Sequence, residues 1–272
     1  MAVTHDDLIQ AIETSLFIYP PTPGLLEPLG VPGVVGRVTP VSHPLPNLVG
    51  LAQLTPENAD DIITAVREVY ARQDKAAGWV VGPLSTPHDL GERLLAADFI
   101  KADEMAGMAL TNLEQPIAVN PAVRVWEANA DELLAATEMM ARAYGLPLEV
   151  AKLLNEMLVG SVDRIRIRLY LASLSDHPTP VAFASLVRLP SSSIVLLGGA
   201  ATLPEARGQG VYTALVARRL ADARIEGAEA AVIQAIRSTS APICRALGFT
   251  ELCGMDFYAW LPPSMRGEAV HA

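Results

Sequence analysis

Cysteines, basic residues and long apolar runs are all scarce in this 272-residue chain. The two cysteines, Cys244 and Cys253, lie in its last tenth and cannot form a disulfide framework, so a reducing, cytoplasmic location is expected. The five histidines are scattered without metal-ligand spacing, and no metal is expected. No stretch approaches the ~20 apolar residues that span a bilayer. The first ten residues, with Asp6 and Asp7, lack the basic and apolar regions of a signal peptide.

The charge balance excludes one further class of partner. Lysine and arginine number 20 against 30 aspartates and glutamates, for a net charge of −10. Without a basic stripe to neutralise phosphates, neither nucleic acid nor a membrane is expected as a partner. The acidic balance mildly favours cationic substrates such as amines. Hydrophobic residues make up 51% of the chain, which is ample for a folded core.

The N-terminal half contains two kinds of sequence. Up to Pro46 it is rich in proline and glycine, which predicts one short helix and then a turn-rich segment laid over the surface. From Asn47 to about Asn112, apolar periodicity and turn residues predict alternating strands and helices. The expected elements are a helix at 6–16, a strand at 47–54, a helix opening at 55–57, a strand at 78–83, a helix at 87–97 and a strand at 99–110.

A joint marked by Pro116 and Pro121 precedes a third, regular zone. Its predicted elements are a strand at 124–128, helices at 130–144 and 148–159, strands at 164–173, 181–189 and 193–202, a helix at 210–226, a strand at 230–235, a helix at 240–247 and a strand at 249–260. The two regular zones also echo each other. A helix leads to Phe99 and then Met105 in one, and to Phe249 and then Met255 in the other, which indicates a faint internal repeat.

The segment from Gly198 to Arg219 carries the strongest chemical signal. An apolar strand stops at a proline, and a glycine-containing loop, 207–210, opens a helix. Unpartnered first-turn N–H groups and the helix dipole make such a place suitable for an anion, and glycines let the backbone approach phosphate closely. Arg207 adds a positive charge. The loop fits neither the P-loop nor the Rossmann pattern, so by itself it is compatible equally with a tight turn before a surface helix.

The context of this loop resembles the GNAT acetyltransferase superfamily over residues 124–260. Arg207-Gly208-Gln209-Gly210-Val211-Tyr212 resembles that superfamily's Gln/Arg-x-x-Gly-x-Gly/Ala pyrophosphate loop, and the segment 241–249 resembles its second hallmark, a helix followed by a Gly-Phe turn. The resemblance implies an α/β chain of two GNAT-like mixed-sheet domains. Residues 1–121 would form a degenerate N-terminal domain with its Pro/Gly-rich leading segment. Residues 122–272 would form the N-acetyltransferase domain, which carries the acetyl-CoA-binding loop.

The resemblance also implies a role for each part of the site. Backbone groups of Ala200, Ala201 and Thr202 would run along the pantetheine arm, because the family splays its fourth and fifth strands and leaves this edge free. The pyrophosphate would be held by Arg207, Gly208, Gln209, Gly210, Val211 and Tyr212. Ser238 would either touch the pantetheine or cap a helix. The reaction expected is direct attack of an amine on acetyl-CoA, a cosubstrate, without a metal.

Two positions depart from the family pattern. Tyr212 stands where glycine or alanine is usual, and Cys244 stands where many members have the tyrosine that protonates the leaving thiolate. A thiol can donate a proton, but a small buried core residue is the preferred interpretation of Cys244. No catalytic residue is assigned. The candidates are Cys244, Tyr170 and Glu251. Asp256, which lies on the same predicted strand as Glu251, is a further candidate.

The N-terminal zone lacks an Arg-x-x-Gly-x-Gly loop, and Asp98 occupies the place of the turn glycine. We therefore interpret it as a repeat that lost its cofactor site and supports the active domain. The expected partners are acetyl-CoA and an amine acceptor, and the assembly is left open, a homodimer included. A non-catalytic acyl-CoA-binding sensor or scaffold is the alternative function, because the family's tyrosine is missing.

Overall fold

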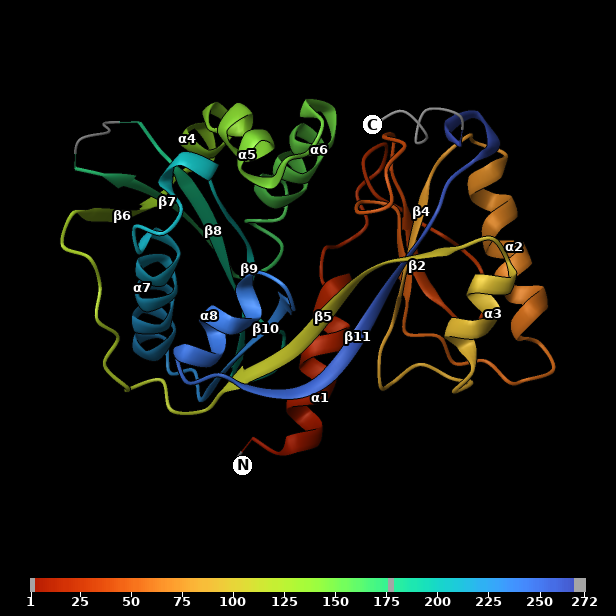
Figure 1. The fold of residues 1–272 in the computed structure, drawn as a ribbon, viewed down its shortest axis with the longest axis horizontal. Helices are drawn as coiled ribbons and strands as arrows, with labels where there is room; N and C mark the ends of the chain where they lie inside the picture. The colour runs from red at the N-terminus through yellow and green to blue at the C-terminus, as the bar shows by residue number, and fades with distance from the viewer. Residues whose placement is uncertain (1–2, 176–178, 267–272) are drawn as a thin grey trace. The chain divides into compact units, whose positions relative to one another are not determined.

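A computed structural model of the chain describes residues 3–175 and 179–266 (Figure 1). The chain forms two compact units, each built from two segments. Unit 1 comprises Met1–Tyr19 and Gly107–Leu252, and unit 2 comprises Pro20–Ala106 and Cys253–Ala272. Each unit thus draws on residues from both sides of position 121. The division into domains at that position stays a prediction.

Unit 1 contains a mixed sheet with the strand order β10-β9-β8-β7-β6. The strands from β6 to β9 pair antiparallel, and β9 pairs parallel with β10. These strands are β6 (Val123–Ala128), β7 (Ile167–Leu174), β8 (Ala182–Arg188), β9 (Ile194–Thr202) and β10 (Ala230–Ile236). Nearly all residues of β7 and β8 are buried, because helices cover both faces of the sheet.

The two faces of this sheet can be assigned from side chains. Tyr170 on β7 bonds to Asp222 of α7, whereas Phe183, opposite the neighbouring Leu171, packs its ring on Tyr144 of α5. Adjacent strand residues point to opposite faces, so α7 and α5 cover different faces. The helices of unit 1 are α1 (His5–Thr14), α4 (Ala130–Ala135), α5 (Thr137–Tyr144), α6 (Leu148–Val159), α7 (Val211–Ile225) and α8 (Ser240–Ala246).

The single helix expected over 130–144 is divided at Ala136 into α4 and α5. Thr137 donates its hydroxyl to the Leu134 carbonyl, and the buried Asn155 amide donates to Leu133 and to Thr137. Side chains that take up helix carbonyls compete with the backbone ladder and favour such a break. The predicted end at Gly145 is confirmed, since this residue is left-handed with φ 70°.

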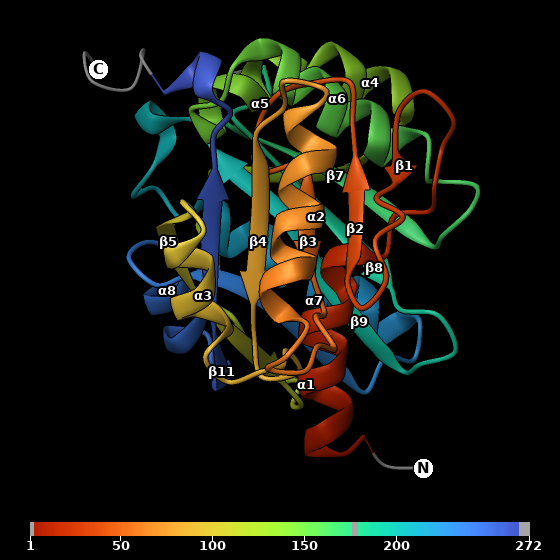
Figure 2. The ribbon, with the colours of Figure 1, turned by 90° about the vertical axis from the view of Figure 1, so that its right-hand side faces the viewer.

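Unit 2 contains the strand order β1-β2-β3-β4-β11, where β11 spans Thr250–Trp260. Figure 2 shows α2 lying in front of β3 and β4. The segment before Pro46 is not only a surface wrap, because β2 pairs with β3 and Leu29 and Val38 enter the core. That core also holds Trp79, Tyr70 and apolar residues of α2 and α3. The elements are β1 (Glu27–Pro28), β2 (Val35–Val38), β3 (Leu48–Gly50), α2 (Ala59–Ala71), β4 (Ala77–Val81) and α3 (Leu90–Ala96).

The structure supports the internal repeat. Helices α3 (Leu90–Ala96) and α8 are equal in length, as are β5 (Ile100–Leu110) and β11 (Thr250–Trp260), and both pairs are separated by the same interval. The connecting turns share a hydrogen bond, from Phe99 N to Leu94 O and from Phe249 N to Cys244 O, each 3.0 Å. Asp98 and Gly248 are left-handed in these turns, with φ 62° and 86°.

Among the residues that the structure describes, no helix is long and apolar enough to cross a membrane.

Candidate functional site

The central feature of unit 1 is a fork between β9 and β10. Their parallel pairing covers Ile194 to Leu196 and Ala230 to Val232. Beyond these pairs β9 continues to Thr202 and β10 to Ile236. Over this stretch β8 is the only strand that pairs with β9 among the described residues, so the other edge of β9 has no strand partner. The resemblance implied a strand edge for the pantetheine arm at this place, and the binding of a ligand along it stays a prediction.

A β-bulge interrupts β9 inside the fork. Ser185 of β8 pairs with Gly198 and Ala184 pairs with Ala200, so Gly199 is the extra residue. A Cβ atom at Gly198 would lie 2.4 Å from Ser185 Oγ, and one at Gly199 would lie 2.6 Å from Tyr144 Oη. Both contacts are too short for any larger residue unless its neighbour moves. A larger residue at either position would therefore require the Ser185 or Tyr144 side chain to move.

The glycine loop follows the strand directly. Gly208 and Gly210 are left-handed, with φ 74° and 78°, and Gly210 is the N-cap of α7. The first α7 amide bond runs from Ala214 N to Gly210 O, which leaves the amides of residues 211–213 outside the intrahelical ladder. A helix of 15 residues directs the positive end of its dipole at this loop. No atom lies within 4 Å of a Cβ built at Gly208, so the loop has open space beside it.

Side chains around the loop hold its shape. Arg207 donates from Nε to the Thr202 carbonyl at 3.2 Å and from Nη2 to the Ala143 carbonyl at 3.1 Å. Both acceptors are neutral and Arg207 is exposed, so its positive charge stays beside the loop. Asn120 donates from Nδ2 to the Gln209 carbonyl at 2.9 Å and lies against Gly210. These contacts hold the backbone around the loop in place.

The two departures from the family pattern contact each other. Tyr212 Oη lies 3.6 Å from Cys244 Sγ, so the first turn of α7 meets α8 at this point. Cys244 is fully buried, and burial raises the pKa of its thiol. Burial likewise raises the pKa of the Tyr212 hydroxyl. Ser238 is exposed before α8, while Ser240 Oγ accepts from Ile236 N at 2.9 Å, and the role of Ser238 stays a prediction.

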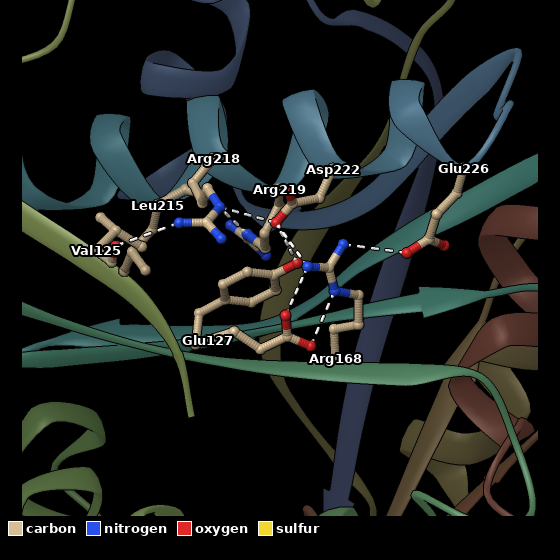
Figure 3. Close-up of polar contacts among 9 residues, drawn as sticks. Val125, Glu127, Arg168, Leu215, Arg218, Arg219, Asp222 and Glu226 are labelled. Atoms are coloured by element: carbon tan, nitrogen blue, oxygen red, sulfur yellow. Dashed lines mark hydrogen bonds and ion pairs between the residues drawn. The ribbon is translucent and has the colours of Figure 1, made fainter. Parts of the chain in front are cut away.

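Tyr170 and Glu251 are engaged in other contacts. Tyr170 donates its hydroxyl to Asp222 at 2.8 Å, and Asp222 also accepts from Arg218 Nε at 2.9 Å. Figure 3 shows Asp222 and Arg218 beside Arg168, which bonds Glu127 and Glu226. Asp222 lies about 15 Å along α7 from Tyr212, at 1.5 Å per residue. Glu251 pairs with Arg237 at 2.7 Å and Arg245 at 3.1 Å. A catalytic role for either residue stays a prediction.

Sequence reasoning missed Tyr144 and Arg219, which meet the bulge. Tyr144 ends α5 with its hydroxyl against Gly199, and Arg219 donates to the carbonyl of Gly198 at 3.1 Å. Two adjacent arginines, Arg218 and Arg219, are typical of an exposed helix face. In the structure Arg219 is fully buried and Arg218 is not. The bulge that Arg219 contacts leaves no signal in the sequence, because it depends on the register between two strands.

In unit 2, protein groups fill the place that corresponds to the fork between β9 and β10. Its β3 also pairs parallel with β4, but the loop from β3 to α2, residues 51–58, contains no glycine. Gln53 and Thr86 form a parallel bridge, and Thr86 N donates to the Ala52 carbonyl at 2.8 Å. Thr86 Oγ1 accepts from Leu54 N at 3.1 Å. Protein groups thus occupy the strand edge that is free in unit 1.

Comparisons with known proteins give similarity at the level of fold. No protein-family profile and no curated protein matches the chain. Among solved structures, a GCN5-related N-acetyltransferase from Kribbella flavida has a TM-score of 0.66 at 16% identity, over 98% of this chain and 99% of that one. A GCN5-related N-acetyltransferase from Sphaerobacter thermophilus has a TM-score of 0.61 at 14% identity, over 84% and 80%.

A third similar structure covers almost the whole chain. It is a tandem GNAT protein from the clavulanic acid biosynthesis pathway, with a TM-score of 0.57 at 14% identity, over 96% of this chain and 97% of that one. The expected fold is therefore confirmed. From the forked sheet, the loop that opens α7 and these similarities together, the chain has the fold of the GNAT superfamily.

Proposed function

We propose that unit 1 binds acetyl-CoA and transfers its acetyl group to an amine. The observation that carries the proposal is the fork between β9 and β10, which leads directly into the glycine loop at the start of α7. A free strand edge and a positive helix end lie in sequence along one segment. Together they suit a ligand with amide groups at one end of its arm and a pyrophosphate at the other.

The residues present fit this cosubstrate. Amides from Gly208 to Tyr212 would hold the pyrophosphate, and the exposed charge of Arg207 would add to them. The backbone from Ala200 to Thr202 would pair with the pantetheine amides. Because the pyrophosphate lies after Thr202, the acetyl end would reach back along β9 toward Gly199 and the bulge.

Acetyl-CoA supplies a thioester as the acyl donor. The amine nitrogen attacks its carbonyl carbon, the carbon–sulfur bond breaks, and the nitrogen loses a proton as the thiolate leaves. We assign no proton acceptor. Cys244 is proposed as a packing residue, since its repeat counterpart Leu94 is also fully buried and carries no proton donor. The departing thiolate would then take its proton from water or from the ammonium being formed.

Unit 2 is proposed as a supporting repeat without a CoA site, because protein groups bridge its strand fork. The sequence division at residue 121, a cytoplasmic location and independence from metal belong to the same proposal. A homodimer remains open.

The test is turnover of acetyl-CoA against a panel of amines: small diamines, aminoglycosides, and peptides with lysine or free N-termini. Release of CoA is followed by chromatography, with calorimetric binding of acetyl-CoA measured in parallel. Binding with amine-dependent CoA release supports the proposal. Binding of acetyl-CoA without CoA release for any amine would favour the alternative, a sensor or scaffold. The observation behind this alternative is the Cys244 thiol at the position where the family has tyrosine. Absence of binding would contradict both.

A further inference from the structure

Arg219 is a fully buried cation that has no carboxylate partner in the structure. Its exposed fraction is 0%. None of the ion pairs among residues 3–175 and 179–266 includes it, and Asp222, one turn further along α7, pairs with Arg218 and Arg168 instead. Figure 3 shows Arg219 directed from α7 toward the sheet. A buried charge without a counter-ion is costly.

The guanidinium is held by backbone carbonyls. Nε donates to Leu215 O at 3.1 Å, and Nη1 donates to Ser185 O and to Gly198 O, each at 3.1 Å. Nη2 is buried and has no hydrogen-bond partner. Carbonyls orient the group but do not neutralise it. The positive charge and two N–H donors therefore remain unused.

The position of these carbonyls is informative. Ser185 and Gly198 form the last register pair before Gly199, so Nη1 bridges the two strands at the bulge. A bulge disrupts the ladder locally, and Arg219 supplies donors where the ladder is irregular. The side chain thus fixes the shape of β9 inside the fork.

Burial lowers the pKa of the Arg219 guanidinium, and the groups that act against this effect are hydroxyls and one thiol. Tyr212, Cys244, Tyr170 and Tyr144 all lie near enough to interact with it electrostatically. Tyr212 and Cys244 belong to the helices that flank the fork, and the Tyr144 hydroxyl touches the bulge. No group in this set offsets the charge. An anion in the fork, either bound or formed during a reaction, would balance the charge of Arg219.

We propose that Arg219 is a positioning residue that fixes the bulge and stabilises negative charge at the acyl end of the cofactor site. The inference rests on the proposed function, because the acyl end is placed at Gly198 and Gly199 by the direction of the cosubstrate along β9. Acyl transfer leaves negative charge first on the thioester oxygen and then on the sulfur. A cation preorganised in a low-dielectric surrounding acts strongly on both.

The test is the pKa of the CoA thiol bound to the full chain, read from thiolate absorbance as the difference between bound and unbound CoA. In the wild type it is expected below the pKa of free CoA in the same buffer. Arg219→Gln keeps hydrogen-bond donors but removes the charge, and should raise the bound-thiol pKa by about one unit or more. Arg219→Lys keeps the charge and should keep the pKa low. Arg218→Gln is the matched control, one residue away, and should leave it unchanged.

Turnover supplies a second readout. Arg219→Gln should lower kcat by about 100-fold, with KM for acetyl-CoA within about threefold, and Arg219→Lys should recover about tenfold or more. A wild-type bound thiol with a pKa at or above that of free CoA would overturn the inference, even if Arg219→Gln fails to fold. So would equal values in the wild type and Arg219→Gln. A wild-type protein that binds no CoA would overturn the proposed function, and this inference with it.

Discussion

Gly208 allows a sharp test of the glycine loop, because the chain provides a matched control. Gly208 and Gly227 have nearly the same left-handed backbone, with φ 74° and 73°, and nothing lies within 4 Å of a Cβ at either position. They lie near the two ends of α7. Replacing each by aspartate therefore adds the same charge and about the same ~1–2 kcal/mol of left-handed strain. Only Gly208→Asp places that charge at the proposed pyrophosphate site.

The expected loss can be estimated. A carboxylate about 5 Å from a phosphate charge costs about 3 kcal/mol at an effective dielectric constant near 20. Each amide hydrogen bond displaced adds about 1.5–3 kcal/mol. Gly208→Asp should weaken CoA binding by about 100-fold or more in calorimetry, whereas Gly227→Asp should stay within about threefold of the wild type. Melting curves check that both variants fold. Equal CoA affinity in the two folded variants would refute the assignment of the loop.

Two further predictions concern the catalytic candidates. Cys244→Ala should change kcat by less than about threefold and cost about 1 kcal/mol of stability, since the thiol is a packing group; a 100-fold fall in kcat at unchanged CoA affinity and Tm would make it catalytic. Tyr170→Phe should keep kcat and lose about 1 kcal/mol of unfolding free energy with the bond to Asp222. Burial first, and Asp222 second, raise the pKa of Tyr170 above its ordinary value near 10. The folded chain therefore holds a proton that the unfolded chain releases, and stability should fall as pH rises above about 10. Urea unfolding at pH 9 to 11 should show a shallower fall in Tyr170→Phe; equal slopes would contradict the assignment.

Much of the fold follows from local signals in the sequence. The α7 start was predictable because glycine, the preceding proline and the helix-forming run act within a few residues of one another. The turns at Asp98 and Gly248 were predictable as a repeat for the same reason, and both are left-handed. The break between α4 and α5 was not predictable from local sequence, because it involves a distant side chain. Asn155 of α6 donates a hydrogen bond to the Leu133 carbonyl of α4.

The bulge and its arginine could not be read from the sequence. Gly199 is extra only relative to Ser185 on another strand, and cross-strand register is a non-local property. Arg219 and Arg218 are adjacent and alike in sequence, yet one is fully buried and the other reaches Asp222. β5 and β11 are each divided between the two units, and the one glycine of each strand, Gly107 or Gly254, lies at or near the change.

A crystal structure of the full chain with CoA tests the central claim most directly. The account predicts one CoA per chain, with its pyrophosphate at the amides from Gly208 to Tyr212, its pantetheine paired with Ala200 to Thr202, and its sulfur near Gly199. CoA bound in unit 2, two CoA molecules per chain, or a pyrophosphate away from the α7 loop would contradict it.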